Sequence, residues 1–265
     1  MGEQGSRPHA TEVPRGRHFL APRLAAELVR AFGVSRDETV VEIGAGSGRL
    51  TRELARAAGL VLAIELDPVL ARGLLRGEAA PPNLFVHRGD ALAAALPPGA
   101  FRLIGNIPFG ISTRLLRRFL DDERTTRADL IVQFEFARKI AAPRGHVLPV
   151  LWATDWHFEL CQRIPASRSH PAPLVDAAWL SAVRRHPPLI LRDDRPAFER
   201  VVRRAFRHAG LPLRRSLEVS PAVLRGAIEG LNARAVDLDV RDWVRLFLAM
   251  AAIDRTGPRR SSSNR

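Results

Sequence analysis

Four consecutive residues in the middle of the chain, Asn106-Ile107-Pro108-Phe109, combine a carboxamide, a rigid turn and an aromatic ring. They follow an apolar run, Phe101 to Gly105, that is typical of a strand. A helix is expected directly after them, with Ser112 or Thr113 as its N-cap. A carboxamide beside an exposed ring suits a planar ligand with hydrogen-bonding groups, so we interpret this segment, the clamp loop, as a candidate site for a nucleobase.

Transfer of a methyl group to an exocyclic amine is the chemistry that needs such a clamp. The lone pair of that amine is delocalised into the purine ring. If the Asn106 side-chain oxygen and the Ile107 carbonyl accepted hydrogen bonds from the amine, its lone pair would be freed for in-line attack on a sulfonium methyl group. Phe109 would stack on the base. No strong general base is needed, because the proton leaves after attack, but the base must be unpaired or flipped out.

A glycine turn, Gly44 to Gly48, follows the β-rich run Thr39 to Ile43. Its pattern is G-x-G-x-G, which differs from the G-x-G-x-x-G dinucleotide fingerprint. Glycines at this point let a ligand lie against the backbone beside a helix N-terminus. Taken alone, the turn is equally compatible with a plain connection between a strand and a helix.

Two acidic residues stand at the ends of the next two predicted strands. Glu65 follows Leu60 to Ile64, and Asp90 follows Leu84 to His87. A carboxylate in the position of Glu65 can accept hydrogen bonds from ribose hydroxyls, and Asp90 could accept from an adenine amine. Since parallel strands end at one edge of a sheet, these groups would converge with the clamp loop. The cofactor would be an adenine nucleoside, NAD or S-adenosylmethionine, and the clamp loop favours the second.

The order of elements predicts an α/β chain with a Rossmann-like, S-adenosylmethionine-dependent methyltransferase fold. Apolar strands alternate with helices as far as the run Leu130 to Gln133, which indicates a parallel sheet covered on both faces. Two more strands, His157 to Ile164 and Val175 to Val183, would form a terminal antiparallel hairpin and complete a seven-stranded, mostly parallel sheet. Helical spacing predicts helices at 22–32, 49–58, from 67, around 198–206, from 220 and at 240–252.

Four segments follow from this pattern. We expect a disordered arm at 1–17, a catalytic domain at 18–190, a small all-α domain at 191–253 and a basic disordered tail at 254–265. The first segment lacks the apolar run of a signal peptide, and no segment reaches membrane-spanning length. We therefore expect a cytoplasmic protein with no membrane partner.

The charge favours a polyanionic partner, nucleic acid first, because the formal net charge is +13. Lys139 is the only lysine, so the excess is almost all arginine, and genomic base bias is a competing explanation for it. Cys161 is the only cysteine, which excludes an internal disulfide and a cysteine-rich metal site. The histidines show no metal-ligand spacing, and the four tryptophans fit core positions better than base stacking.

From about Arg17 to Met250 the chain resembles the ribosomal RNA adenine N6-methyltransferases, the group of the Erm macrolide-resistance enzymes and the KsgA-type dimethyladenosine transferases. Its length, its short helical domain and its arginine-rich tail resemble the Erm branch. The motifs that carry the resemblance are Arg17-His18-Phe19-Leu20, Val41 to Gly48, Ile64-Glu65-Leu66-Asp67, Gly89-Asp90, Gly105 to Phe109, Gln133 to Lys139 and His170-Pro171-Ala172-Pro173.

The resemblance implies a role for each matching position. The target adenine would be held by Asn106, Ile107, Pro108 and Phe109. The cofactor would be bordered by His18, Leu20, Gly44, Gly46, Glu65, Leu66, Asp90, Ala91 and Asn106. The RNA would meet Arg114, Arg138 and Lys139.

Three positions depart from the family pattern. Arg17-His18 stands where the family usually has Gln-Asn, so the contact of that Asn cannot be assumed for His18. Phe109 replaces a frequent tyrosine and keeps the ring. Ser169 stands where an aromatic residue often precedes the x-Pro-x-Pro motif, which removes one expected stacking wall.

The resemblance implies N6-methylation, single or double, of an adenine in the peptidyl-transferase loop of 23S rRNA by a monomeric enzyme. The expected consequence is resistance to macrolide, lincosamide and streptogramin B antibiotics. Three alternatives remain open at this point. They are a KsgA-like enzyme acting on 16S rRNA, a non-catalytic RNA-binding assembly factor on the same scaffold and, more distantly, a nicotinamide dehydrogenase.

Overall fold

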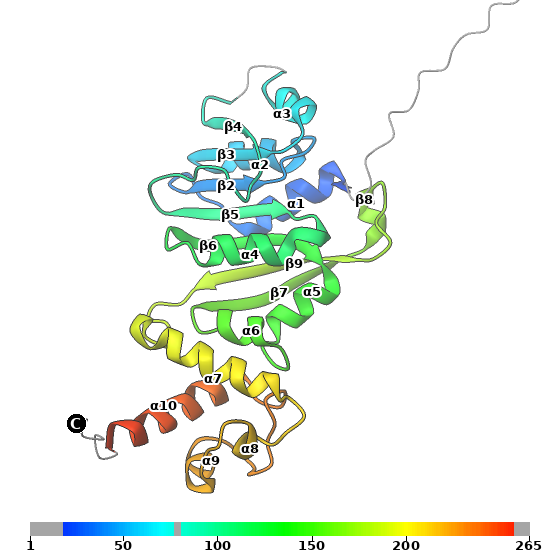
Figure 1. The fold of residues 1–265 in the computed structure, drawn as a ribbon. Helices are drawn as coiled ribbons and strands as arrows, with labels where there is room; N and C mark the ends of the chain where they lie inside the picture. The colour runs from blue at the N-terminus through cyan, green and yellow to red at the C-terminus, as the bar shows by residue number, and fades with distance from the viewer. Residues whose placement is uncertain (1–17, 77–80, 257–265) are drawn as a thin grey trace, which may run out of the picture.

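Seven strands form one sheet in the order β4-β3-β2-β5-β6-β9-β7 (Figure 1). This is the arrangement in a computed structural model, which describes residues 18–76 and 81–256. Strands β4 through β6 in that order are parallel neighbours, and β9 runs antiparallel to both β6 and β7. The predicted parallel sheet with a terminal antiparallel hairpin is therefore confirmed. The strands are β2 (Thr39–Ile43), β3 (Leu60–Glu65), β4 (Leu84–Arg88), β5 (Phe101–Asn106), β6 (Thr125–Gln133), β7 (Trp156–Ile164) and β9 (Ala177–Arg184).

Helices cover both faces of this sheet, each over its own apolar core. One core takes residues from α1 (Pro22–Phe32) and α2 (Arg49–Ala57), with α3 (Pro68–Leu75) beside α2. The other core takes residues from α4 (Ser112–Leu120), α5 (Phe134–Ala141) and α6 (Val147–Trp152). Strands buried on both faces explain why their sequences read as continuous apolar runs rather than as an alternation.

Local signals explain some of the helix ends. The α1 helix stops at Gly33, which has a left-handed φ of 64°. Asp67 caps α3 by accepting hydrogen bonds from the amides of Val69 and Leu70. The predicted side-chain cap of α4 is wrong. The turn η1 (Phe109–Ile111) leads straight into that helix, and the Ser112 hydroxyl donates backwards to the carbonyl of Pro108 at 3.3 Å.

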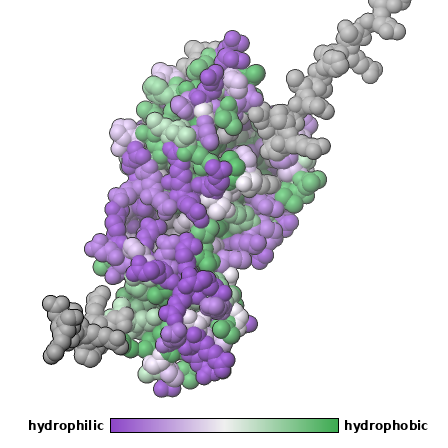
Figure 2. Space-filling view, viewed as in Figure 1, coloured by the Kyte–Doolittle hydropathy of each residue, from purple (hydrophilic) through white to green (hydrophobic). Residues whose placement is uncertain are grey.

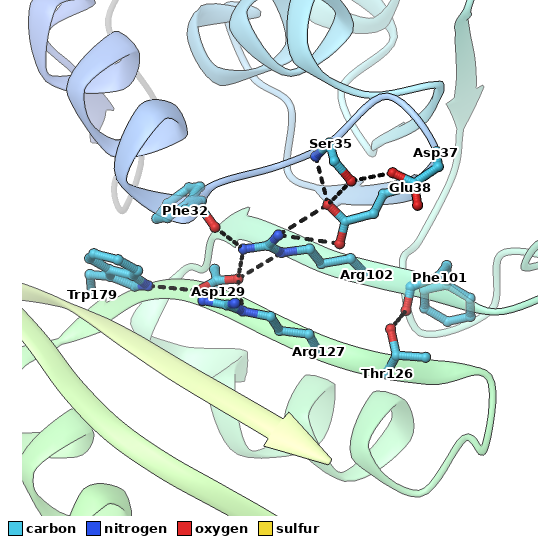
Figure 3. Close-up of polar contacts among 10 residues, drawn as sticks. All are labelled: Phe32, Ser35, Asp37, Glu38, Phe101, Arg102, Thr126, Arg127, Asp129 and Trp179. Carbon is cyan, nitrogen blue, oxygen red and sulfur yellow. Dashed lines mark hydrogen bonds and ion pairs between the residues drawn. The ribbon is translucent and has the colours of Figure 1, made fainter.

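Strand β6 starts five residues earlier than the apolar pattern indicated, because its first half is polar and carries a buried ionic cluster (Figure 3). The Asp129 carboxylate is fully buried and pairs with Arg102 of β5 at 2.7 Å. It also accepts hydrogen bonds from Arg127 and from the Trp179 indole. Arg102 in turn donates to the Phe32 carbonyl at the end of α1. This cluster lies toward the amino ends of β5 and β6 and links them to α1.

A second, two-stranded sheet joins the start of the described chain to the proline-rich segment before β9. It pairs β1 (Phe19–Leu20) antiparallel with β8 (Ser169–His170). The short turn η2 (Ala166–Arg168) precedes β8. These elements were not predicted, since two-residue strands carry no periodic signal. They are important for the site because they hold the first motif of the chain against the large sheet.

The remaining helices gather around a third core. They are α7 (Arg195–Arg207), α8 (Leu213–Ser216), α9 (Pro221–Ala227) and α10 (Val240–Thr256), with the turn η3 (Arg192–Asp194) before them. The predicted start at Ser220 is confirmed, because its side chain accepts from the amide of Val223. Ile190 and Val150 of α6 also belong to this core. The predicted division at 190/191 stays a prediction, as do the arm at 1–17 and most of the tail, which lie outside the described residues; α10 continues to Thr256.

Candidate functional site

The carboxyl ends of β2, β3, β4 and β5 meet at one edge of the sheet, where open α/β sheets bind ligands. Backbone hydrogen bonds hold neighbouring tips together. The Gly44 amide donates to the Ile64 carbonyl at 2.9 Å, and the Gly89 amide donates to the Glu65 carbonyl at 3.0 Å. The predicted convergence of the glycine turn, the two acids and the clamp loop is therefore present in the geometry.

The glycine turn needs glycine at three of its positions. Gly44, Gly46 and Gly48 have left-handed φ values of 68°, 56° and 77°. A Cβ on Gly46 would lie 3.0 Å from the ring of Phe19, so β1 closes over the turn. A Cβ on Gly44 would point toward the clamp loop, 3.7 Å from the Asn106 backbone oxygen. Gly44 is exposed, and the backbone there can be approached closely by a ligand.

Glu65 connects two of the converging loops. One carboxylate oxygen accepts from the Gly46 amide at 2.7 Å, and the other accepts from the Asp67 amide at 2.8 Å. The residue is only 7% exposed. A carboxylate has about four lone-pair sites, so each oxygen keeps the capacity for one further donor. The residue is thus oriented by the fold and still able to accept from a pair of hydroxyls.

The tip of β4 offers a second acceptor. One Asp90 oxygen accepts from the Leu92 amide at 2.8 Å, and the residue is exposed. Leu66, at the tip of β3, has an exposed apolar side chain (68%), and Ala91 is half-buried. An acceptor flanked by apolar side chains is the composition that a purine edge and face require.

The side chain of Asn106 has a fixed orientation. Its amide nitrogen donates to the His18 carbonyl at 2.7 Å. Because that carbonyl can only accept, the nitrogen must face it and the side-chain oxygen must face away. Within residues 18–76 and 81–256 that oxygen has no hydrogen-bond partner. His18 is itself held by a 2.8 Å hydrogen bond between its Nδ1 and the Pro171 carbonyl.

The other predicted site residues are distributed as follows. Ile107 is buried, and its amide donates to Ile131 at 2.9 Å, which fixes the backbone of the clamp loop. Pro108 is exposed, and its carbonyl accepts from Ile111. The ring of Phe109 lies outside the described side chains. Leu20 packs into the core between α1 and the sheet, so only its backbone can border a ligand.

Glu42, which lies within the Val41 to Gly48 motif, has an unusual environment in the structure. It is buried in β2, and burial raises its pKa from 4.5 to about 7, assisted by the nearby Glu65 charge. The hydroxyl of Thr51 on α2 acts in the opposite direction. The sequence feature that could have indicated this buried carboxyl group is an acidic residue inside an otherwise apolar strand.

The residues predicted to meet RNA occupy the same side of the sheet as the second core. Arg114 on α4 and Lys139 on α5 are exposed, and Arg138 pairs with Glu135 at 2.7 Å. Hydrophilic side chains cover much of the face that carries these helices (Figure 2). The interpretation of the tryptophans as core residues is confirmed for Trp152, Trp156 and Trp243, which are 4%, 1% and 0% exposed.

Two kinds of feature are absent from the described part of the chain. Within the described part of the chain, no group of three or more histidine, cysteine, aspartate or glutamate side chains could hold a metal ion. No helix among those residues is both long and apolar enough to cross a membrane.

The fold and the strand-tip site define a Rossmann-like methyltransferase class of protein. Within that class, a family model described as ribosomal RNA adenine dimethylase matches residues 15–252, and the chain belongs to this family. Families of this kind are S-adenosylmethionine-dependent methyltransferases.

Similar proteins fall into two groups by name. The chain is 33% identical over 224 residues to the mycinamicin-resistance protein MyrB of Micromonospora griseorubida, covering 83% of this chain and 68% of MyrB. It is 33% identical over 245 residues to a ribosomal RNA small subunit methyltransferase A of Rubrobacter xylanophilus, covering 88% and 92%. The crystal structure of the 23S rRNA methyltransferase ErmE superposes with a TM-score of 0.80 at 30% identity, covering 88% of this chain and 99% of that one. The chain spans only 60% to 63% of several other curated relatives named as rRNA methyltransferases.

Proposed function

We propose that the protein uses S-adenosylmethionine to methylate N6 of an adenine in the peptidyl-transferase loop of 23S rRNA. The observation that carries this proposal is the Asn106 side chain. Its amide nitrogen is held by the His18 carbonyl, so its oxygen is a fixed acceptor without a partner among the described residues, on the loop that Gly44 faces. A fixed acceptor at a strand tip is what an exocyclic amine requires.

The residues at the neighbouring strand tips fit the cofactor. Gly44 offers an exposed backbone, Glu65 keeps two acceptor sites for ribose hydroxyls, and Asp90 can accept from an adenine amine. When bound, S-adenosylmethionine supplies an electrophilic methyl group on a sulfonium centre. The approach of Gly44 to Asn106 supports a position for the cofactor opposite the clamp loop.

The clamp loop would prepare the target amine. The Asn106 oxygen and the Ile107 carbonyl would accept hydrogen bonds from its two N–H groups, which turns the lone pair out of the purine plane. Phe109 stacks on the ring and restricts its motion. Transfer of the methyl group would break its bond to the sulfonium sulfur, leave a neutral thioether and form a bond to N6. The methylated amine would then be cationic and acidic, and one proton would pass to water. The backbone hydrogen bond from Ile107 to Ile131 keeps this geometry rigid.

Arginine and lysine side chains would supply the affinity for RNA through phosphate contacts, which are weakened by salt. Arg114, Arg138 and Lys139 are the residues proposed for this role. The adenine must be unstacked to enter the site, so the flipped base supplies the specificity. The protein would act as a monomer in the cytoplasm, where ribosomal RNA is made.

Resistance to macrolide, lincosamide and streptogramin B antibiotics would follow from methylation of that loop. The name of MyrB, a mycinamicin-resistance protein, supports this part of the proposal. The test is methylation in vitro of transcripts of 23S and 16S rRNA by the purified protein with labelled S-adenosylmethionine. We expect label in the 23S transcript only. Label confined to the 16S transcript would contradict the proposal that 23S rRNA is the substrate.

A KsgA-like reaction on 16S rRNA is the second candidate, and one observation favours it. The chain covers 92% of the small subunit methyltransferase from Rubrobacter xylanophilus, whereas it covers 68% of MyrB. The same pair of transcripts separates the two candidates. A non-catalytic assembly factor would bind RNA without binding the cofactor, so isothermal titration with S-adenosylmethionine excludes or supports that alternative.

A further inference from the structure

An apolar pocket of about 280 Å³ lies between the start of α4 and helices α5 and α6. Ile140 and Trp152, 3% and 4% exposed, are among its lining residues, and Phe136 adds a half-buried aromatic ring. None of the residues proposed for the cofactor or the target adenine lines it. The pocket is therefore a second concave site that the proposed reaction does not use.

The rim of the pocket is basic. Lys139 and His146 line it and are exposed. No carboxylate lies within ion-pair distance of Lys139 in the part of the chain that the structure describes, whereas its neighbour Arg138 is paired with Glu135. An apolar interior with an unpaired cation at its mouth is complementary to a ligand that has a flat apolar body and an anionic group.

The pocket is also connected to the clamp loop. Thr113, which lines it, belongs to the first turn of α4. That turn is tied to the clamp loop by hydrogen bonds from the Ile111 amide and the Ser112 hydroxyl to the Pro108 carbonyl. A polymer whose target base is held by the clamp loop would present its neighbouring residues to this region.

From these observations we infer that the pocket binds one unstacked nucleotide of the substrate RNA, near the target adenine in the same strand, with its base inside and its phosphate at Lys139. This inference rests on the proposed function. The volume lies just below the range of about 300–1,000 Å³ for small-molecule sites, which suits a single base. Bases splayed onto aromatic side chains, with cations on the backbone, are the usual mode of single-strand recognition.

The lining determines what kind of selectivity this site has. Its interior offers stacking surface and few groups for hydrogen bonds to a base edge. The pocket therefore accepts different bases, but a nucleotide without a base binds less tightly. The pocket consequently selects for an unpaired nucleotide at a fixed position, which adds a requirement of RNA shape to the recognition of the adenine.

The test uses hairpins of the 23S rRNA loop that each carry one abasic nucleotide near the target adenine. Their dissociation constants are measured by fluorescence anisotropy for the unmodified protein, for Thr113→Leu, and for the control Arg225→Gln on α9. Thr113→Leu extends an aliphatic chain into the pocket from an exposed helix position. Arg225→Gln removes an exposed cation that does not line the pocket.

We expect one abasic position to weaken binding about tenfold in the unmodified protein and in Arg225→Gln. In Thr113→Leu the intact and abasic hairpins should bind equally, both at the weakened level. If every abasic effect is the same in all three proteins, the inference is wrong. If the unmodified protein does not methylate the intact hairpin, it is instead the proposed function that fails.

A second measurement avoids any substitution. Lys139 is the only lysine of the chain, so reductive methylation with a ¹³C reagent places one side-chain reporter at the pocket. The intact hairpin should protect Lys139 from this reaction at least fivefold, and the hairpin lacking the same base should protect it less. Equal modification with and without the intact hairpin would overturn the inference.

Discussion

At the scale of single residues, the proposed methyl transfer depends on how the side-chain amide of Asn106 is oriented. Asn106 could rotate freely if its nitrogen had no partner, and a freely rotating amide would present a donor to the amine as often as an acceptor. The His18 carbonyl removes that ambiguity with a 2.7 Å hydrogen bond. His18 therefore contributes through its backbone, which explains why a histidine is compatible with a position where the family usually has asparagine.

Replacement of Asn106 by alanine should abolish methyl transfer and leave cofactor binding within about threefold. The acceptor for the amine is lost, whereas Glu65 and Asp90 are unchanged. We expect at least a hundredfold loss of kcat, since one well-placed polar group of this kind is worth about 10²–10³. The rate is measured with a labelled cofactor and the affinity by titration calorimetry.

Asn232→Ala, an exposed asparagine in the helical part, is the matched control and should be fully active. Methyl transfer by Asn106→Ala at the normal rate would rule out the clamp mechanism.

Phe109 should tolerate tryptophan and not alanine. Stacking of a base on an aromatic ring is worth about 1–3 kcal/mol, so Phe109→Ala should lose about tenfold or more in kcat/KM. Phe109→Trp keeps the aromatic face and should stay within a few-fold of the original value. An equal loss in both variants would mean that the site requires the shape of phenylalanine, and that stacking is not its main role.

At the scale of elements, the packing of α2 on β2 buries an ionisable group. Glu42 has a pKa raised from 4.5 to about 7 by burial in the native state. Between these values the native protein binds more protons than the unfolded chain. The contribution to stability is therefore complete below pH 4.5 and is lost as the pH rises through 7.

We expect the free energy of unfolding to fall by about 3 kcal/mol from this group between pH 4.5 and 8. Urea unfolding at a series of pH values measures it. Glu42→Gln, which cannot ionise, should flatten the profile in this range. A profile that is identical in the two proteins would contradict the burial of a protonated Glu42.

The ionic cluster between β5 and β6 should stabilise the sheet only as a pair. Asp129→Asn leaves the buried Arg102 cation undercompensated, with an expected cost of about 3–5 kcal/mol in unfolding free energy. Combining it with Arg102→Met removes both charges and should recover part of that loss. The three variants are compared by urea denaturation, and additive costs would show that the two side chains are not energetically coupled.

The strand that carries this cluster, β6, was predicted from the sequence only in its apolar second half. Strands β2 and β3 begin and end close to their predicted limits, because most of their residues are apolar. The first half of β6 is polar. Its buried residue Asp129 has its partners Arg102 and Trp179 at 27 and 50 residues' distance in the chain. No local pattern reports such a pairing. Helix α6, which contributes to the apolar pocket, was likewise not predicted.

At the scale of the whole molecule, the order of motifs predicts more than any single motif does. The glycine turn alone was compatible with a plain connection, but Glu65, Asp90 and the clamp loop follow it on successive strands of one parallel sheet. Topology then requires them to meet at one edge, and they do. The closure of that edge by β1 and β8 could not be predicted, since it depends on a contact between His18 and Pro171 across the whole catalytic part of the chain.

Only part of the positive charge of the chain can be assigned to the proposed RNA contact. Residues 186–265 hold 16 arginines against nine acidic residues, but several of these arginines pair with carboxylates three or four residues away in the chain. The exposed cations of α4 and α5 border the proposed site. The proposed RNA contact is therefore a local surface near the clamp loop, whatever the origin of the arginine-rich composition.

The most direct test of the account is mass spectrometry of 23S rRNA fragments from cells that express the protein. We expect one adenine of the peptidyl-transferase loop to be heavier by one or two methyl groups, and no such change in cells that express Asn106→Ala. An unmodified loop, or methyl groups found only in 16S rRNA, would contradict the central claim.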